Sequence, residues 1–248
     1  MRRLAVALLS VGLVVGGAAI AQSPTASAAI AAAVADTARP EADRARDAAR
    51  KPDQMVAFAG VEPGDIVAEM SPGGGYYTRI LSKTVGPNGH VYALVPAAFA
   101  QRPGGLDNIT ALAASLGNVT VVPVTFTDFT VEKPVDLVWT SENYHDWHNG
   151  ETANIAGVNA SVFKALKPGG VFFVEDHAAL DGAGAAVTQE LHRMDPELAR
   201  QELTAAGFTI EAESDALRNP DDARTAGVRD SGVQGHTEKF AFRARKPG

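Results

Sequence analysis

Cysteine is absent from this 248-residue chain. Disulfide bonds, thiolate catalysis and zinc sites built from thiolates are therefore excluded, and a chain of this length can bury an adequate core without such cross-links. An excess of basic residues is absent too, because 22 lysines and arginines face 29 acidic residues and give a net charge of −7. Such a balance disfavours non-specific binding of nucleic acid, which needs basic groups opposite the phosphates.

Long apolar runs are missing from the chain except near its start. Two arginines precede an apolar run over residues 4–20, and the small residues Ala19 and Ala21 fit a cleavage site, with residues 26–28 as a second possible site. This order predicts a secretory signal peptide over residues 1–21, with a membrane anchor as the alternative. We therefore expect an exported protein, periplasmic or secreted, with no stable membrane insertion after cleavage.

The rest of the chain divides into two parts. Residues 22–40 are rich in alanine and serine and show little pattern, which predicts a flexible tether. Residues 41–248 predict a single domain that begins with a short solvated helix and shows no internal repeat.

Strands and helices alternate through most of that domain. Strands are predicted over residues 65–70, 90–95, 119–124, 135–140, 171–175, 208–213 and 239–245. Helices are predicted over residues 53–60, 77–84, 108–116, 158–166 and 196–206. The early strands are continuous apolar runs, as in strands buried on both faces. The pattern predicts an α/β fold with an open, doubly wound, mostly parallel sheet, whose last two strands form an antiparallel pair at one edge.

A glycine-rich turn follows the first of these strands. The strand ends at Glu69, and Ser71, Pro72 and three glycines lead into a helix. Glycines such as Gly73 and Gly75 let the backbone take a positive φ or approach a ligand closely, and the free N–H groups of the first helical turn point at that ligand. The layout predicts a nucleotide or nucleoside site, although such turns also occur with no ligand.

Three features together carry a family resemblance. They are the glycine loop Glu69–Gly75, the Leu166–Gly170 turn before an apolar strand, and the order of the strands. With them the chain resembles the class I S-adenosylmethionine-dependent methyltransferases over roughly residues 46–246. Segments 74–78, 143–146, 175–177 and 192–196 also resemble an exported bacterial group of predicted methyltransferases. The resemblance implies a Rossmann-like seven-stranded sheet, mostly parallel with an antiparallel edge strand.

The resemblance also implies S-adenosylmethionine as the cofactor. The residues that it assigns to cofactor binding are Glu69, Ser71, Gly73, Gly75, Asp128 and Asn143. Of these, the glycine loop would cradle the methionine and ribose parts, Asp128 would approach the adenine, and Asn143 would line the boundary between cofactor and substrate.

Two departures from the family pattern bear on cofactor affinity. Ser71 stands in place of the first glycine, and the strand over residues 90–95 ends without the acid that takes the two ribose hydroxyls. A hydrogen bond to a charged group contributes about 1.5–3 kcal/mol, so its loss lowers affinity by about one to two orders of magnitude unless another residue compensates. The same absence disfavours dinucleotide binding, as does Thr78 where a third glycine is needed.

A polar cluster follows the fourth and fifth predicted strands. His145 is our candidate for general base, since its unperturbed pKa lies near 6.5, and Asp146 or Asp176 would orient it. The alternatives are a metal site that uses His145, His148, His177 and Asp176, or histidines that only make local hydrogen bonds.

Three functional hypotheses follow. The first is an enzyme that transfers a methyl group from S-adenosylmethionine to an unidentified small molecule, with His145 and Asp146 as catalytic residues. The second is a non-catalytic small-ligand-binding protein of the same fold, favoured by the missing acid and the export signal. The third is a metal-dependent, hydrolase-like activity of the histidine and aspartate cluster. Fold alone does not decide between them.

Overall fold

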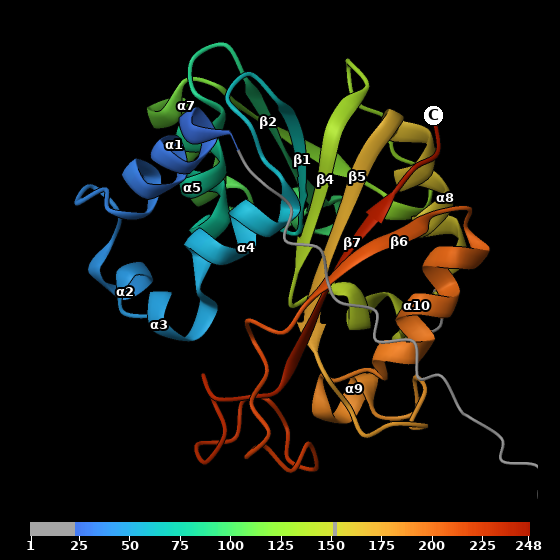
Figure 1. The fold of residues 1–248 in the computed structure, drawn as a ribbon. Coiled ribbons are helices and arrows are strands. Elements are labelled where there is room, and N and C mark those ends of the chain that lie inside the picture. The colour runs from blue at the N-terminus through green and yellow to red at the C-terminus, as the bar shows by residue number, and fades with distance from the viewer. Residues whose placement is uncertain (1–22, 151–152) are drawn as a thin grey trace, which may run out of the picture.

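A seven-stranded sheet forms the centre of the molecule in this computed structural model, which describes residues 23–150 and 153–248 (Figure 1). The strands are β1 Ile66–Met70, β2 His90–Pro96, β3 Val119–Val124, β4 Val135–Ser141, β5 Leu166–His177, β6 Thr209–Ser214 and β7 Lys239–Arg245. The α-helices are α1 Pro24–Val34, α2 Glu41–Arg44, α3 Asp47–Arg50, α4 Pro52–Ala59, α5 Tyr76–Val85, α6 Ala97–Ala100, α7 Asp107–Leu116, α8 Ile155–Ala165, α9 Thr188–Leu191 and α10 Pro196–Ala205. Two 3-10 helices, η1 Phe126–Asp128 and η2 Tyr144–His148, follow β3 and β4.

The sheet has the order β3-β2-β1-β4-β5-β7-β6. Strands β1 to β5 pair in parallel, whereas β7 pairs antiparallel with both β5 and β6. The predicted α/β class, the seven strands and the antiparallel pair at one edge are confirmed. Within that pair, β7 lies against β5 and β6 forms the outer edge.

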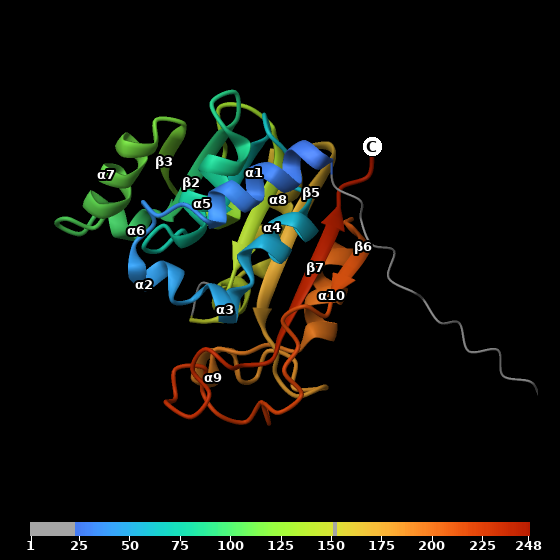
Figure 2. The same ribbon diagram turned by 60° about the vertical axis from the view of Figure 1, so that its left-hand side comes forward.

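Helices cover both faces of the sheet (Figure 2). On one face α1, α4 and α5 enclose a core that includes Val67, Leu137 and Phe173. On the other face α8 and α10 pack over a second core that includes Phe172 and Phe242. Neighbouring residues of β5 thus face opposite cores, which is why this strand is a continuous apolar run.

Helix α1 corrects one prediction. Residues 22–40 were expected to be a flexible tether, but residues 24–34 form a helix whose Ala26, Ile30 and Ala33 are buried. Alanine has the highest helix propensity, and this spacing puts one apolar stripe against the domain. The predicted signal peptide over residues 1–21 lies outside the described residues. Among the helices of the described part of the chain, none is long and apolar enough to cross a membrane.

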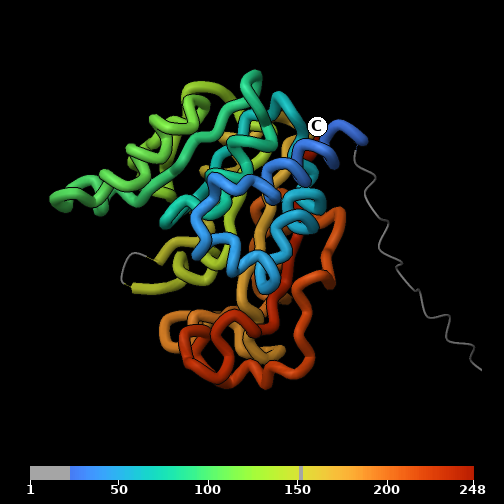
Figure 3. The backbone as a smooth tube through the Cα atoms, turned by 90° about the vertical axis from the view of Figure 1, so that its left-hand side faces the viewer, coloured from blue at the N-terminus to red at the C-terminus, as the bar shows by residue number. Residues whose placement is uncertain are grey.

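The carboxyl ends of β1, β4 and β5 meet at one edge of the sheet. Below this edge lie α9 and the long segment 215–238, which joins β6 to β7 (Figures 1 and 3). This segment is held by a buried ion pair, in which Arg193 Nη1 lies 2.8 Å from Asp222 Oδ2. The topology therefore brings the glycine loop, η2 and a covering segment to the same place.

Candidate functional site

The glycine loop has the left-handed backbone that its sequence requires. Ser71, Gly73 and Gly75 have φ values of 52°, 56° and 81°. A Cβ added to Gly73 would have no atom within 4 Å, whereas one added to Gly75 would lie 2.2 Å from a methyl group of Leu112. Gly73 therefore faces open space, while Gly75 permits close packing of the start of α5. Ser71 keeps the conformation of the glycine that it replaces, at a cost of about 1–2 kcal/mol.

Glu69 lies at the end of β1, directly under this loop. Its side chain accepts a hydrogen bond of 2.6 Å from Thr78 Oγ1, and the residue is only 3% exposed. Burial raises the pKa of Glu69 to about 7, against the opposing effects of the Thr78 hydrogen bond and the Arg50 charge. A buried carboxyl that gains a cationic neighbour regains its charge, so this position suits an ammonium group.

Three cavities meet at the carboxyl ends of the central strands. One of about 180 Å³ is lined by Glu69 and Arg50. A second, of about 660 Å³, lies between the glycine loop and the end of β2. A third, of about 450 Å³, lies between η2 and the segment 215–238. Asn143 lines all three cavities.

At the end of β2, the 660 Å³ cavity is lined mainly by apolar side chains. Val95 and Pro96 line it where an acid was missing from the sequence, and Phe126 of η1 adds an aromatic side. Asn108 is a polar residue on this wall. Asp128 was expected to approach an adenine, but it is exposed and is not among the residues that line the cavity. Phe126, two residues before Asp128, lines the cavity.

A buried ionic network separates the two smaller cavities. The Glu142 carboxylate contacts Lys239 Nζ and Arg50 Nη2, and Lys239 Nζ also lies 3.3 Å from Glu175 Oε1. Burial opposes the charge on Glu142, but Lys239 and Arg50 outweigh it and hold the pKa of this carboxyl well below its usual range. Glu142 also has φ 58°, so its backbone is in a conformation that few side chains adopt.

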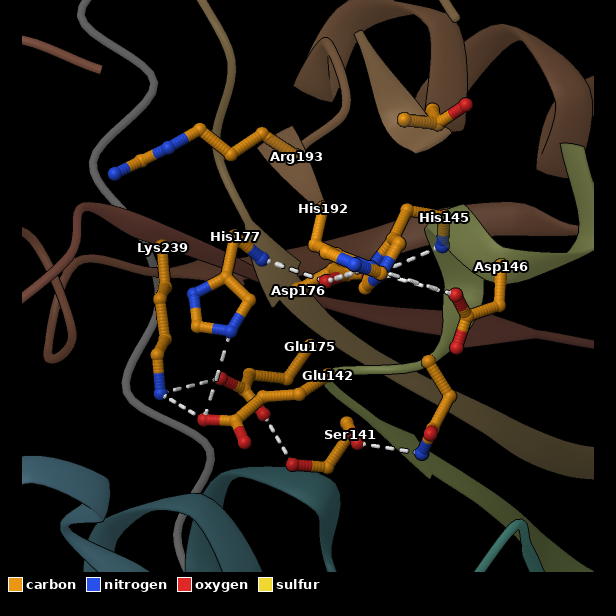
Figure 4. Close-up of polar contacts among 12 residues, drawn as sticks. Ser141, Glu142, His145, Asp146, Glu175, Asp176, His177, His192, Arg193 and Lys239 are labelled. Carbon is orange, nitrogen blue, oxygen red and sulfur yellow. Dashed lines mark hydrogen bonds and ion pairs between the residues drawn. The ribbon is translucent and has the colours of Figure 1, made fainter. Parts of the chain in front are cut away.

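His145 is fixed by a fully buried carboxylate. Its Nδ1 lies 2.9 Å from Asp176 Oδ1, and its backbone N–H donates to Asp176 Oδ2 at 2.7 Å (Figure 4). The predicted orientation by Asp176 is therefore present, and the ring is only 3% exposed. Burial alone would lower the pKa of His145, but Asp176 and Asp146 raise it to about 10. At neutral pH this ring holds a proton, which is unfavourable for the predicted role as a general base.

Two neighbours meet the other ring nitrogen of His145. His145 Nε2 lies 3.1 Å from His192 Nδ1 and 3.2 Å from Asp146 Oδ1. Burial, together with the charges of Arg229 and His145, lowers the pKa of His192. Asp146 is thus adjacent to the histidine, as predicted, and His192 is a third member of the group.

The other histidines of the predicted cluster have separate partners. His148 Nε2 lies 2.8 Å from Glu202 Oε1 on α10, which makes it a packing residue. His177 Nδ1 lies 2.8 Å from Thr237 Oγ1, and burial with the Lys239 charge lowers the pKa of His177 to about 4. The alternative metal set of His145, His148, His177 and Asp176 is therefore not brought to one point.

Sequence reasoning missed two charged contributors to this site. Arg50 precedes the strands, in a helix predicted to be solvated. Lys239 is the first residue of β7 and pairs in register with His177. A lysine at the start of a buried strand was the sequence feature that could have identified it. His192, by contrast, lies in segment 192–196 of the family resemblance; it has φ 53° at the end of α9, where it contacts His145.

Comparisons with known proteins identify the fold. No known protein family matches this chain. A SAM-dependent methyltransferase from Aquifex aeolicus is similar in structure, with 16% identity, a TM-score of 0.56 and coverage of 81% of this chain and 97% of that one. The [4+2]-cyclase SpnF has 16% identity and a TM-score of 0.59, with coverage of 90% and 93%. The glycopeptide N-methyltransferase MtfA, complexed with S-adenosyl-L-methionine, has 17% identity and a TM-score of 0.53, with coverage of 82% and 94%.

These structural neighbours confirm the fold of class I methyltransferases. At such identities the likeness concerns the fold, and a cyclase among the neighbours illustrates that one fold supports different reactions. The function must therefore be argued from the cavities and the side chains that line them.

Proposed function

We propose that this chain is an enzyme that transfers a methyl group from S-adenosylmethionine to a small molecule. The observation that carries the proposal is the junction at Asn143. There a cavity beside the glycine loop meets a cavity lined by ionisable side chains. A two-substrate reaction needs such a junction, because the reacting atoms must come together while the rest of each substrate is held apart. The structural likeness to methyltransferases supports the choice of donor.

The donor fits the two cavities that share the glycine loop. Its methionine ammonium group is assigned to the buried carboxyl of Glu69, and its adenosine to the 660 Å³ cavity. Gly73 leaves room for the ligand where its backbone passes. Asn108 is the polar residue that we assign to the ribose hydroxyls, in place of the acid that β2 lacks.

The acceptor then occupies the 450 Å³ cavity beside His145 and Asp146. A lone pair of the acceptor forms a bond to the methyl carbon while the carbon–sulfur bond breaks. The bonding electrons pass to sulfur, so the sulfonium becomes a neutral thioether, and the acceptor releases its proton to solvent or to a side chain of this cavity. The protein contributes alignment of the two substrates and an environment for the released proton.

A non-catalytic role in binding a nucleoside-like ligand is the second candidate. One observation favours it: the apolar pair Val95 and Pro96 at the end of β2, which forms no hydrogen bond with ribose hydroxyls. It predicts binding of the donor without turnover.

Calorimetric titration with S-adenosylmethionine and with S-adenosylhomocysteine tests the proposal. Gly73→Asn places a side chain that tolerates a left-handed backbone in the cavity, and we expect affinity to fall by at least about tenfold. Gly117→Asn is the matched control, since Gly117 also has a positive φ and open space but lies outside these cavities.

The outcomes separate the candidates. Failure of the parent chain to bind either ligand would refute the methyltransferase proposal. Equal affinities for the parent and Gly73→Asn would move the donor away from the glycine loop. Binding without formation of S-adenosylhomocysteine, measured by mass spectrometry with a panel of small anionic and neutral acceptors, would favour the non-catalytic role.

A further inference from the structure

Three potential metal ligands converge at the rim of the 450 Å³ cavity. His145 Nε2, His192 Nδ1 and Asp146 Oδ1 all lie within 4.8 Å of one another. The separations are 3.1 Å between the two ring nitrogens, 3.2 Å from His145 Nε2 to the carboxylate, and 3.8 Å from His192 Nδ1 to it. Figure 4 shows the side chains of His145 and Asp146, both from η2, close to that of His192, which follows α9.

These separations suit a single ion. A divalent first-row metal binds imidazole nitrogen and carboxylate oxygen at about 2.0–2.2 Å. Two such ligands at angles of about 90–110° are then about 3.0–3.4 Å apart. Two of the three observed separations fall in that range. The third is longer by a few tenths of an ångström, and Asp146 is free to adjust because its side chain is 51% exposed.

The tautomer of His145 is already set for such a role. Its Nδ1 faces the buried carboxylate of Asp176 at 2.9 Å, so this nitrogen keeps its hydrogen, and Nε2 presents its lone pair once an ion displaces the second proton of the ring. A carboxylate behind a metal-bound histidine is a common arrangement, which orients the ring and makes it a better ligand.

His192 is held in place by backbone contacts with the end of β5. The Met194 N–H donates to the carbonyl of His177 at 3.0 Å, and the Ala179 N–H donates to the carbonyl of Met194 at 2.8 Å. These bonds fix the turn in which His192 takes its left-handed conformation, with φ 53°. The ligand set thus combines a rigid pair of histidines with one adjustable carboxylate.

The open side of the ligand set faces basic residues. Arg46 and Arg229 line the same cavity and are exposed, and within the described residues neither has an ion pair with an acidic side chain. An anionic oxygen ligand that entered this cavity would meet an ion on one side and guanidinium groups on the others.

We propose that His145, Asp146 and His192 bind one divalent first-row transition metal ion, and that the ion with Arg46 and Arg229 receives a small anionic ligand. Two imidazoles and one carboxylate leave coordination positions open for that ligand. A bound cation lowers the pKa of a hydroxyl that it contacts, so the site would also prepare an acceptor. The metal site stands on its own geometry, and the acceptor role rests on the function proposed above.

Titration of the untagged, chelator-treated chain with Co²⁺ tests the site, because the ion reports its coordination through its visible spectrum. We expect one equivalent to bind. His192→Asn suits a left-handed residue and Asp146→Asn changes an exposed side chain, so both variants should fold, and each should bind Co²⁺ at least about tenfold more weakly. The buried Asp176→Asn should weaken binding by about 10–100-fold. His236→Asn, an exposed histidine outside the cluster, is the control and should change nothing.

Oxalate, a bidentate anion, then probes the open positions. It should change the Co²⁺ spectrum of the parent chain, and Arg229→Gln should weaken that effect. Binding of less than one equivalent of Co²⁺ would overturn the metal site, and so would Co²⁺ affinities that are unchanged in both His192→Asn and Asp146→Asn. In that case a proton on His145, shared with its two neighbours, explains why the three side chains lie close together. An unchanged spectrum with oxalate would overturn the anionic ligand. Because titration with S-adenosylmethionine is separate, failure of either proposal is visible without the other.

Discussion

Glu69→Gln should make the protein more stable at alkaline pH while it weakens binding of the donor. In the folded chain burial raises the pKa of Glu69 from its ordinary value of 4.5 to about 7. The folded state therefore holds this proton more tightly than the unfolded chain does, and the free energy of unfolding falls as pH rises from about 4.5 to about 7. Above about pH 7 the side chain is charged in both the folded and the unfolded chain, and the full cost of burying that charge remains.

The size of the effect follows from the same two values. The difference between 4.5 and about 7 corresponds to a penalty of about 3 kcal/mol at pH 8 and less than about 1 kcal/mol at pH 5. Glutamine is neutral at both pH values, and its amide oxygen can still accept the 2.6 Å hydrogen bond from Thr78. The pKa of about 7 already includes the attractions of Arg50 and Arg79, which lower it, so their loss subtracts nothing further from this gain.

Thermal unfolding measured from pH 5 to pH 8 tests this reasoning. A domain of this size gains about 2–4 °C per kcal/mol, so Glu69→Gln should melt about 6–12 °C above the parent at pH 8 and close to it at pH 5. Glu132→Gln, which changes an exposed glutamate, is the control and should show no such difference. A gain that is absent at pH 8, or equal at both pH values, would refute the buried and ionised state of Glu69.

The remaining predictions concern single contacts. Asp222→Ala leaves the guanidinium of Arg193 buried without its partner and should lower the free energy of unfolding by about 3–5 kcal/mol in denaturant titrations, whereas alanine at the exposed neighbour Asp221 should change it little. Ser71→Gly relieves a left-handed serine but adds chain entropy, so we expect a gain of up to about 1 kcal/mol in the same assay; a loss would contradict the strain. If the predicted signal peptide is removed, intact-mass measurement of protein from an envelope fraction should show cleavage after Ala21, because a cut within α1 would remove its buried alanine.

The strands were predictable because burial on both faces leaves little ambiguity in their sequences. Four of the seven strands begin at their predicted residue, and β3 and β7 also end as predicted. β5 is longer than expected, since the Leu166–Gly170 turn continues the strand and β4 accommodates it with a bulge between Val135 and Leu137. Helix α1 was missed because an alanine-rich segment resembles a linker, and its burial depends on a partner that is distant in sequence.

The site was predictable where one element carries both chemistry and position. Glu69 lies near the end of β1, and Gly73 and Asn143 follow β1 and β4 closely, so the order of the sheet places them at one edge. The contact between His192 and His145 was harder to predict, since it spans 47 residues and depends on a left-handed turn. Protonation was also out of reach, because it depends on which carboxylates a ring meets in three dimensions.

The end of β2 shows why fold and cofactor affinity must be argued separately. Val95 and Pro96 keep their register with Pro123 and Val124 of β3, so the sheet does not depend on an acid at this point. That acid would serve only a ligand, and its absence leaves the architecture intact. Structural likeness therefore persists whether or not a ribose binds here. The affinity must come from groups that likeness does not reveal: the buried carboxyl of Glu69 and polar residues such as Asn108. These residues, rather than the glycines, decide between an enzyme and a protein that has kept only the fold.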